Sequence, residues 1–259
     1  MINNYEDFKD AVFKLSSIDL DAYKERQMKR RIDSLIKKNK ADNYQEFIDK
    51  LKIDKKLYEE FINYLTINVS EFYRNPAQWM VLEKDIFPFL LERFSGNLKI
   101  WSSACSTGDE PYSLAMLLSK FVPLNKIKII ATDIDKQVLE KARLGLYKEK
   151  SIEGLPKEFK SKYLKQVGSS YQITDDIKKC IEFKQLNLLK DSYPTQCDLI
   201  VCRNVLIYFT DEAKDGIYRK FNKSLKKDGI LFVGSTEQII QSAEYSFSPM
   251  KSFFYKKDA

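Results

Sequence analysis

The most informative absence in this sequence is histidine, of which its 259 residues contain none. Catalysis by an imidazole base, in a Ser-His-Asp triad or a Cys-His pair, is therefore excluded, and so are most zinc sites. The four cysteines are scattered and form no C-x-x-C pair. We therefore predict no metal site, reduced and buried thiols, and a chemistry that needs no imidazole.

Long apolar runs are also missing, since no stretch approaches the roughly 18 uninterrupted apolar residues of a membrane-spanning helix. The N-terminal residues MINNYEDFKD show no basic segment followed by an apolar one, which is the pattern of a secretory signal peptide. We therefore expect a cytoplasmic protein that does not span a membrane.

Glycine and proline are scarce, with eight and seven residues, and neither occurs between residues 5 and 65. Apolar residues in this stretch recur at helical spacing, as Phe8, Val12 and Leu15 do. The pattern predicts a small bundle of about four helices. We assign residues 1–72 to an all-helical N-terminal domain.

From there to the end, short β-branched runs alternate with helical segments, which predicts a doubly wound, Rossmann-like α/β domain over residues 73–259. The predicted strands are 98–104, 127–134, 180–186, 198–205 and 229–235, and the helices between them are 111–121, 136–144 and 211–225. Residues 249–257 are predicted to form a last strand at the sheet edge. An insert at about 145–179 ends in a predicted hairpin of residues 171–173 and 177–179.

The turn after the first predicted strand is the first candidate ligand site, because ligands bind at the carboxyl ends of such strands. It contains only one glycine, Gly108, so it is neither a P-loop nor a G-x-G-x-x-G turn. Asp109 and Glu110 follow at the start of the next helix, where carboxylates would repel phosphates. They suit a cationic ligand such as S-adenosylmethionine, although they could instead serve only to complement the helix dipole.

The second predicted strand ends in the acidic sequence TDID, where this architecture holds ribose hydroxyls. Asp133 and Asp135 are both candidates. One would bind the ribose and the other would cap the following helix, and the residues alone do not choose between them.

Three stretches resemble the CheR-type chemotaxis receptor methyltransferases: TINVSEFYR at 66–74, STGDEPYS at 106–113 and CRNVLIYF at 202–209. Together with the predicted all-helical N-terminal domain and the TDID sequence, the resemblance covers essentially the full chain. It implies an S-adenosylmethionine-dependent methyltransferase domain with a small β-subdomain insert. It also implies formation of glutamyl methyl esters on the cytoplasmic domains of chemotaxis receptors in sensory adaptation, with S-adenosylhomocysteine as the product. In some members the insert captures a peptide at the receptor tail.

The resemblance also implies where the cofactor binds. The family's contacts fall on Asn68, Ser70, Arg74, Glu110, Asp135, Asn187, Leu188, Arg203 and Asn204, with Asp133 as a second choice for the ribose. Where the family often has another glutamate, this sequence has Asp109, a departure that leaves Glu110 in place.

The implied reaction explains how an enzyme without histidine could work. A glutamate side chain with an ordinary pKa of about 4.3 is already ionised at neutral pH, so no general base is required. The enzyme then has only to hold the reacting groups in line. Tyr208 and Arg74 are the candidates for positioning the acceptor carboxylate, unless Tyr208 is a core aromatic of the sheet.

The formal net charge of +7 suggests an acidic partner. A basic face on one predicted helix is the candidate docking site for the acidic receptor bundle, although it could simply be a solvated face. Its residues are Lys24, Arg26, Lys29, Arg30 and Arg31.

Two other functions compete with this one. A nucleic-acid methyltransferase would use the basic helices to grip phosphates, but such enzymes usually carry a proline-aromatic signature where this chain has Arg203 and Asn204. We therefore expect no nucleic-acid partner. The other alternative is a signalling scaffold that binds S-adenosylmethionine without turnover.

Overall fold

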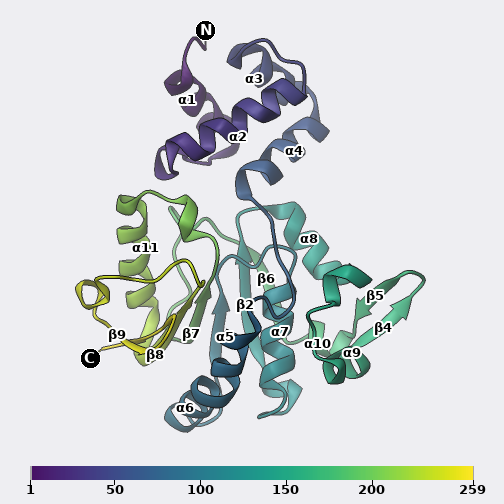
Figure 1. Cartoon of the computed structure of the whole chain (residues 1–259), viewed down its shortest axis with the longest axis vertical. Helices are drawn as coiled ribbons and strands as arrows, with labels where there is room; N and C mark the ends of the chain where they lie inside the picture. Colours follow the sequence, from purple (N-terminus) through teal and green to yellow (C-terminus); the bar gives the residue numbers. More distant parts are fainter. Residues whose placement is uncertain (1, 259) are drawn as a thin grey trace. The chain divides into compact units, whose positions relative to one another are not determined.

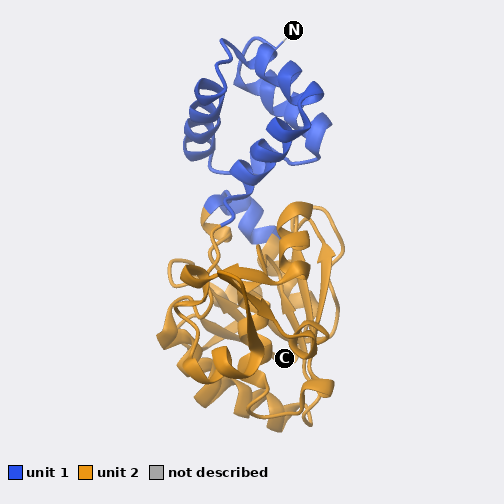
Figure 2. Ribbon diagram, turned by 90° about the vertical axis from the view of Figure 1, so that its right-hand side faces the viewer, with its two compact units in different colours: residues 1–68, 208–216 blue, residues 69–207, 217–259 orange. Residues whose placement is uncertain are grey.

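The computed structural model describes residues 2–258, which divide into two compact units (Figure 2). The first unit contains the chain up to Asn68 together with Tyr208–Gly216, and the second contains Val69–Ile207 and the chain from Ile217 onward. The change of unit at Asn68 comes a few residues before the boundary that we predicted. Within the described residues, no helix has both the length and the apolar character needed to cross a membrane.

The first unit contains the predicted helices, which are α1 (Tyr5–Ser16), α2 (Glu25–Lys38), α3 (Tyr44–Ile53) and α4 (Lys55–Thr66). The side chains of Asn4, Asn43 and Asp54 accept backbone N–H groups in the first turns of α1, α3 and α4, which sets where these helices begin. Phe8 and Phe61 are fully buried, with their ring centroids 6.4 Å apart and edge-on. The apolar faces of the helices thus meet in one aromatic core.

A later segment, Tyr208–Gly216, belongs to the first unit because it pairs with residues just before α2. The backbone N–H of Lys24 donates to the carbonyl oxygen of Tyr208 over 2.9 Å. The rings of Tyr23 and Phe209 lie 4.8 Å apart, centroid to centroid. The stretch that carries Tyr208 is therefore anchored to the helical unit, an association that local sequence patterns do not predict.

The second unit is built on a seven-stranded sheet with the strand order β6-β2-β1-β7-β8-β10-β9 (Figure 1). Strands β6, β2, β1, β7 and β8 are parallel, and the sheet order reverses beside β1, as in a doubly wound fold. The bounds are β1 (Lys99–Ser102), β2 (Lys128–Asp133), β6 (Ile181–Gln185), β7 (Cys197–Cys202), β8 (Leu225–Val233), β9 (Phe247–Lys251) and β10 (Phe254–Lys257). The predicted fold class is confirmed.

Helices cover both faces of this sheet because neighbouring residues of β1 point to opposite sides. Ile100 joins the core that includes Tyr112 of α7, whereas the ring of Trp101 lies 5.6 Å from that of Phe221 in α11. The helices around this sheet are α5 (Pro76–Val81), α6 (Phe87–Arg93), α7 (Asp109–Leu118), α8 (Lys136–Leu144) and α11 (Asp211–Ser224), of which α11 enters this unit at Ile217; a π-helical segment (Leu82–Ile86) joins α5 to α6.

The C-terminal prediction of one edge strand over residues 249–257 is wrong. This stretch contributes to two antiparallel strands, β9 and β10, and β10 lies between β8 and β9, which leaves β9 at the edge. Phe254 stacks on Phe232 of β8 with ring centroids 4.1 Å apart. This cross-strand pair, which a sequence pattern cannot reveal, places β10 inside the sheet.

The insert forms a small antiparallel sheet of its own, with the order β3-β5-β4. Its strands are β3 (Leu146–Lys148), β4 (Leu164–Val167) and β5 (Ser170–Ile173), and its helices are α9 (Lys157–Tyr163) and α10 (Asp175–Lys178). The predicted hairpin partner at residues 177–179 is wrong. The chain turns at Gly168, which has a φ of +59°, and β5 then pairs with the preceding strand β4. Asp175 and Asp176 instead open α10, where acidic residues favour a helix start.

Candidate functional site

The predicted site residues of the second unit cluster at the carboxyl ends of β1, β2, β6 and β7. The turn after β1 is hydrogen-bonded to both neighbouring strands. The backbone N–H of Ser103 donates to the carbonyl oxygen of Val201, and that of Cys105 donates to the carbonyl oxygen of Thr132, each over 2.9 Å. Gly108 has a φ of +93°, and a Cβ there would lie 2.9 Å from the Cβ of Ala142. A side chain at this position is therefore excluded both by strain and by space.

Asp109 is a buried carboxylate that ties this turn to the chain entering the second unit. It accepts the Thr107 hydroxyl over 2.5 Å, and it also accepts the hydroxyl of Ser70, one of the predicted cofactor residues. Burial raises the pKa of Asp109, although these hydrogen bonds act in the opposite direction. The Asp109 carboxylate thus has a structural role, since it accepts hydrogen bonds from two protein hydroxyl groups.

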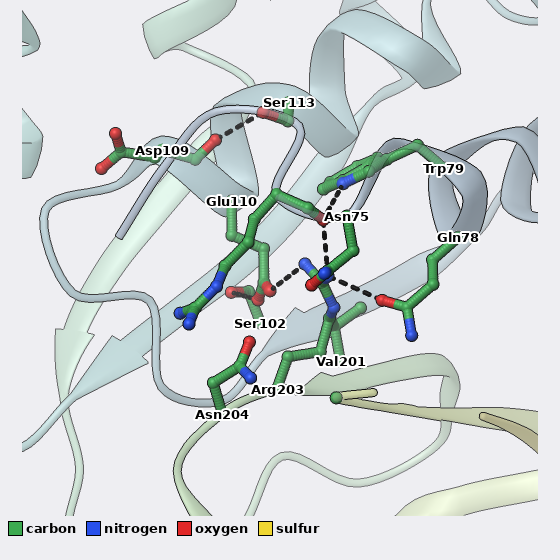
Figure 3. Close-up of polar contacts among 12 residues, drawn as sticks. Asn75, Gln78, Trp79, Ser102, Asp109, Glu110, Ser113, Val201, Arg203 and Asn204 are labelled. Carbon is green, nitrogen blue, oxygen red and sulfur yellow. Dashed lines mark hydrogen bonds and ion pairs between the residues drawn. The ribbon is translucent and has the colours of Figure 1, made fainter. Parts of the chain in front are cut away.

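Glu110 forms the centre of the site together with Arg203 (Figure 3). The distance between Arg203 Nη1 and Glu110 Oε2 is 3.4 Å, and the two side chains are only 2% and 12% exposed. Ser102 donates its hydroxyl to the other oxygen of Glu110 over 2.8 Å. Burial raises the pKa of Glu110, while Arg203 and Ser102 oppose that rise.

The guanidinium of Arg203 also binds the N-terminal end of α5 and the two residues before it, as Figure 3 shows. Its Nη2 donates to the carbonyl oxygen of Arg74 and to Gln78 Oε1, each over 2.7 Å, and to Asn75 Oδ1 over 3.2 Å. The ring of Phe232 lies 4.9 Å from the guanidinium carbon. Arg203 therefore connects the end of β7 to α5 and to Glu110 at once.

Arg74 and Asn68 fall on either side of the change between units. Arg74 is half-buried, and its Nη1 donates to the carbonyl oxygen of Val69 over 3.3 Å. Asn68, in the first unit, donates its side-chain amide to Thr66 Oγ1 over 2.9 Å and to Asn63 Oδ1 over 3.2 Å. Local hydrogen bonds thus orient both side chains.

The two aspartates after β2 have different roles in the structure. Asp135 caps α8, accepting the N–H of Gln137 over 2.8 Å, and is almost fully buried. Asp133 accepts the N–H of Ser106 on one oxygen over 2.8 Å and that of Asp135 on the other over 3.0 Å. Burial raises the pKa of Asp133 to about 6. Asp133 therefore joins the turn after β1 to the turn after β2.

Asn187 and Leu188 lie in the turn that follows β6. Asn187 Oδ1 accepts the N–H of Leu189 over 2.9 Å, which is ordinary Asx-turn chemistry. The carbonyl oxygen of the buried Leu188 accepts the hydroxyl of Tyr193 over 2.6 Å, and Lys220 donates to the carbonyl of Leu189 over 2.9 Å. This turn is thus fixed from two sides.

Glu237, in the turn after β8, is a site residue that our sequence reasoning missed. It is 5% exposed, and its carboxylate accepts the backbone N–H groups of Asn204, Leu206, Ile207 and Gly234. In the sequence, Glu237 stands out only as an acidic residue shortly after a buried apolar strand that ends at Val233.

Tyr208 ends a 3-10 turn, Leu206–Tyr208, in the loop after β7. Its side chain is half-buried and is not part of the sheet, so the alternative of a core aromatic in the sheet is wrong.

The predicted basic face belongs to the first unit, and most of it lies on α2. Arg26, Lys29 and Arg30 line a surface cavity of about 400 Å³, together with Asp33, Ser34 and Lys37. Arg31 differs, because its Nη2 donates to the carbonyl oxygen of Tyr64 in α4 over 2.7 Å and its guanidinium lies 4.4 Å from that ring. The α2 face that we define here therefore consists of Arg26, Lys29, Arg30 and Lys37.

Comparison with known proteins identifies the family of the chain. The family model described as the CheR methyltransferase all-alpha domain matches residues 3–66, and that of the CheR methyltransferase SAM binding domain matches residues 68–254. A chemotaxis protein methyltransferase of Listeria innocua is 44% identical over 254 residues, covering 98% of this chain and 97% of that protein. Those of Borreliella burgdorferi and Salmonella typhimurium are 36% and 31% identical, covering 88% and 95% of this chain and 85% and 88% of those proteins.

These matches confirm the resemblance drawn from the three sequence stretches and the predicted cofactor. The chain belongs to the CheR family of S-adenosylmethionine-dependent chemotaxis methyltransferases.

Proposed function

We propose that this protein methylates glutamate side chains on the cytoplasmic domains of chemotaxis receptors. The observation that carries the proposal is the buried Glu110 in the first turn of α7, where a phosphate-binding turn would leave the helix N-terminus open. A carboxylate at that place selects a cationic ligand over a phosphorylated one. The absence of histidine is consistent with an acceptor that is already ionised.

The residues at the strand ends fit S-adenosylmethionine. Its ammonium and ribose hydroxyls need hydrogen-bond acceptors, and the turns after β1 and β2 supply the carboxylates of Glu110, Asp133 and Asp135. Ser106 Oγ is buried and has no hydrogen-bond partner among the described residues, so a polar group remains to be satisfied there. The donor set thus suits a ligand with both a positive charge and a diol.

The residues that would hold the cofactor are those that the family resemblance indicates. Following the family resemblance, we assign the ribose to Asp135 and keep Asp133, whose two oxygens accept backbone N–H groups, as the second choice. The proposed set is Asn68, Ser70, Arg74, Glu110, Asp135, Asn187, Leu188, Arg203 and Asn204.

When bound, S-adenosylmethionine would supply a sulfonium methyl group for transfer to an ionised carboxylate, with the neutral thioether S-adenosylhomocysteine as the leaving group. The protein's contribution is then to orient the acceptor and to exclude water. We assign orientation of the acceptor carboxylate to the Tyr208 phenol and the Arg74 guanidinium. Backbone bonds fix both segments, since Tyr208 O accepts Lys24 N–H and Arg74 O accepts Arg203.

Receptor docking is assigned to the α2 face. Arg26, Lys29 and Arg30 lie one helical turn or less apart, so their charges concentrate on one side of α2. An acidic helical bundle is the complementary partner for such a surface.

The test is incubation of the full chain with methyl-labelled S-adenosylmethionine and receptor cytoplasmic fragments. We expect alkali-labile methyl ester on the fragments, and none on fragments whose glutamates are replaced by glutamine. Label on RNA would indicate the nucleic-acid alternative. Binding of S-adenosylmethionine without any transferred label would indicate the non-catalytic scaffold.

A further inference from the structure

The carboxylate of Glu237 sits between the exits of two adjacent parallel strands. Strands β7 and β8 pair up to Cys202 and Val233, and the chain leaves both strands immediately afterwards. Glu237 Oε1 accepts the N–H groups of Leu206 over 2.7 Å and Ile207 over 3.3 Å. The carboxylate therefore links the turn after β8 to the loop after β7.

The second oxygen completes the arrangement. Glu237 Oε2 accepts the N–H of Asn204 over 2.5 Å and that of Gly234 over 2.9 Å. Asn204 has a φ of +60°, in the left-handed region that a non-glycine residue adopts only where its surroundings hold it. Each oxygen thus receives two backbone donors, and one of them fixes a strained residue of the loop.

Gly234 provides a separate indication that the chain is shaped around this carboxylate. A Cβ at Gly234 would overlap Glu237 Oε2 and would lie 2.9 Å from the backbone nitrogen of Asn204. Any larger residue there would push the carboxylate away from the loop. The position of Glu237 is further secured by the N–H of Ile239, which donates to the Tyr255 hydroxyl over 2.9 Å.

We propose that Glu237 is a positioning residue for methyl transfer, which holds the residues from Asn204 to Ile207 in their working conformation. The inference rests on the proposed function, because this segment carries Asn204 for the cofactor and follows Arg203 directly. Arg203 is held by its own side-chain bonds to Glu110 and Gln78. The backbone of the residues after Arg203 is instead held by Glu237, whose carboxylate accepts N–H groups from Asn204 to Ile207.

The decisive variant is Glu237→Gln, which keeps the shape of the side chain. An amide has one acceptor oxygen, so its NH₂ group must face two of the four backbone donors, and the loop must move. A displacement of about 1 Å at a reacting centre can cost about 100-fold in rate. We expect kcat per site that binds S-adenosylhomocysteine to fall roughly 100-fold, with KM for the receptor fragment changed less than about threefold.

Two further variants complete the experiment. Gly234→Ala displaces the same carboxylate without changing its chemistry and should lower kcat in the same way. If Glu237→Gln does not fold, this variant tests the positioning role instead. Glu244→Gln, the same change at an exposed residue nearby, should leave kcat unaltered. Folded Glu237→Gln or Gly234→Ala protein with the wild-type kcat would overturn the positioning role. Absence of transfer by the wild-type chain would instead refute the proposed function itself.

Discussion

Arg203, directly after β7, and Glu110, in the first turn of α7, form a buried ion pair with Nη1 and Oε2 3.4 Å apart. The pair joins two segments that are 93 positions apart in the sequence. Because Arg203 also binds Gln78 and the carbonyl of Arg74, it links α5 to the sheet. If Arg203 also contacts the cofactor, as we propose, stability and cofactor binding depend on the same guanidinium.

Replacing Arg203 by methionine should lower the free energy of unfolding by roughly 3 kcal/mol, because removal of one partner leaves a buried carboxylate without its counter-charge. Urea unfolding monitored by tryptophan fluorescence measures this loss. The control is Arg93→Met, which breaks the exposed pair with Asp228 and should cost about 1 kcal/mol or less. Equal losses in the two variants would contradict a special role for the buried pair.

The raised pKa of Asp133 should appear in the pH dependence of stability. Its pKa is about 6 in the folded protein against 3.8 as the ordinary value, so the folded state retains the proton to higher pH. Its contribution to stability is complete below about pH 4 and is lost as the pH rises through about 6, a change of roughly 3 kcal/mol.

Asp133→Asn removes this titration. From pH 4 to pH 7, the unfolding free energy of the wild type should therefore fall relative to that of the variant by about this amount. Denaturant unfolding at several pH values measures it. Parallel pH profiles for the two proteins would show that Asp133 ionises normally.

Asp135 combines a helix cap with the proposed ribose contact, and two substitutions separate these roles. Asparagine can still cap α8, whereas alanine should cost about 1 kcal/mol of stability. Both variants should bind S-adenosylhomocysteine about tenfold or more weakly in calorimetry, since each loses a charged acceptor. Wild-type affinity in Asp135→Asn, with a loss in Asp133→Asn, would move the ribose contact to Asp133.

Tyr208→Phe and Arg74→Ala should each lower the rate of transfer about tenfold or more, because the acceptor carboxylate loses one orienting donor. Affinity for S-adenosylhomocysteine should change by less than about threefold in Tyr208→Phe, whereas Arg74→Ala, which also removes a member of the proposed cofactor set, should weaken it. Tyr64→Phe, which also removes a phenol hydroxyl from the first unit, serves as the control. Unchanged turnover in either variant would remove that residue from the mechanism.

Reversing charge on the α2 face should weaken receptor recognition. In Arg26→Glu with Arg30→Glu we expect KM for the receptor fragment to rise about tenfold at low salt, with kcat retained and the effect smaller at high salt. Lys55→Glu with Lys56→Glu makes the same charge change at the start of α4. If both double variants raise KM equally, total charge and not the α2 face determines binding.

Much of the fold could be predicted from the sequence, because helix and strand periods are local properties of the chain. The predicted helices 136–144 and 211–225 agree closely with α8 and α11, and all five predicted parallel strands are present. The errors occurred where several pairings were equally compatible with the local pattern. Residues 177–179 and 249–257 are such places: the first stretch is not a strand at all, since β5 pairs with β4, and the second contributes to two strands of the sheet.

The chemistry of the site could be anticipated only in part. Glu110 and Arg203 stand out in the sequence as charges beside apolar strands, but their mutual ion pair is a tertiary contact. Arg31 belongs to the basic run, yet its guanidinium lies against α4. Glu237 was missed because a carboxylate that binds backbone N–H groups leaves no recognisable spacing in the sequence.

The order of residues by itself determined the absence of an imidazole base, the alternation of elements and the three motifs of the family, since each depends on residue type or short spacing. Only the tertiary structure decided that Asp109 and Asp133 serve the turn after β1, that Arg203 connects the end of β7 to two other segments and that Glu237 holds the loop after β7. The reason is that a hydrogen bond acts over about 3 Å, a distance at which residues far apart in the sequence meet only after the sheet has formed.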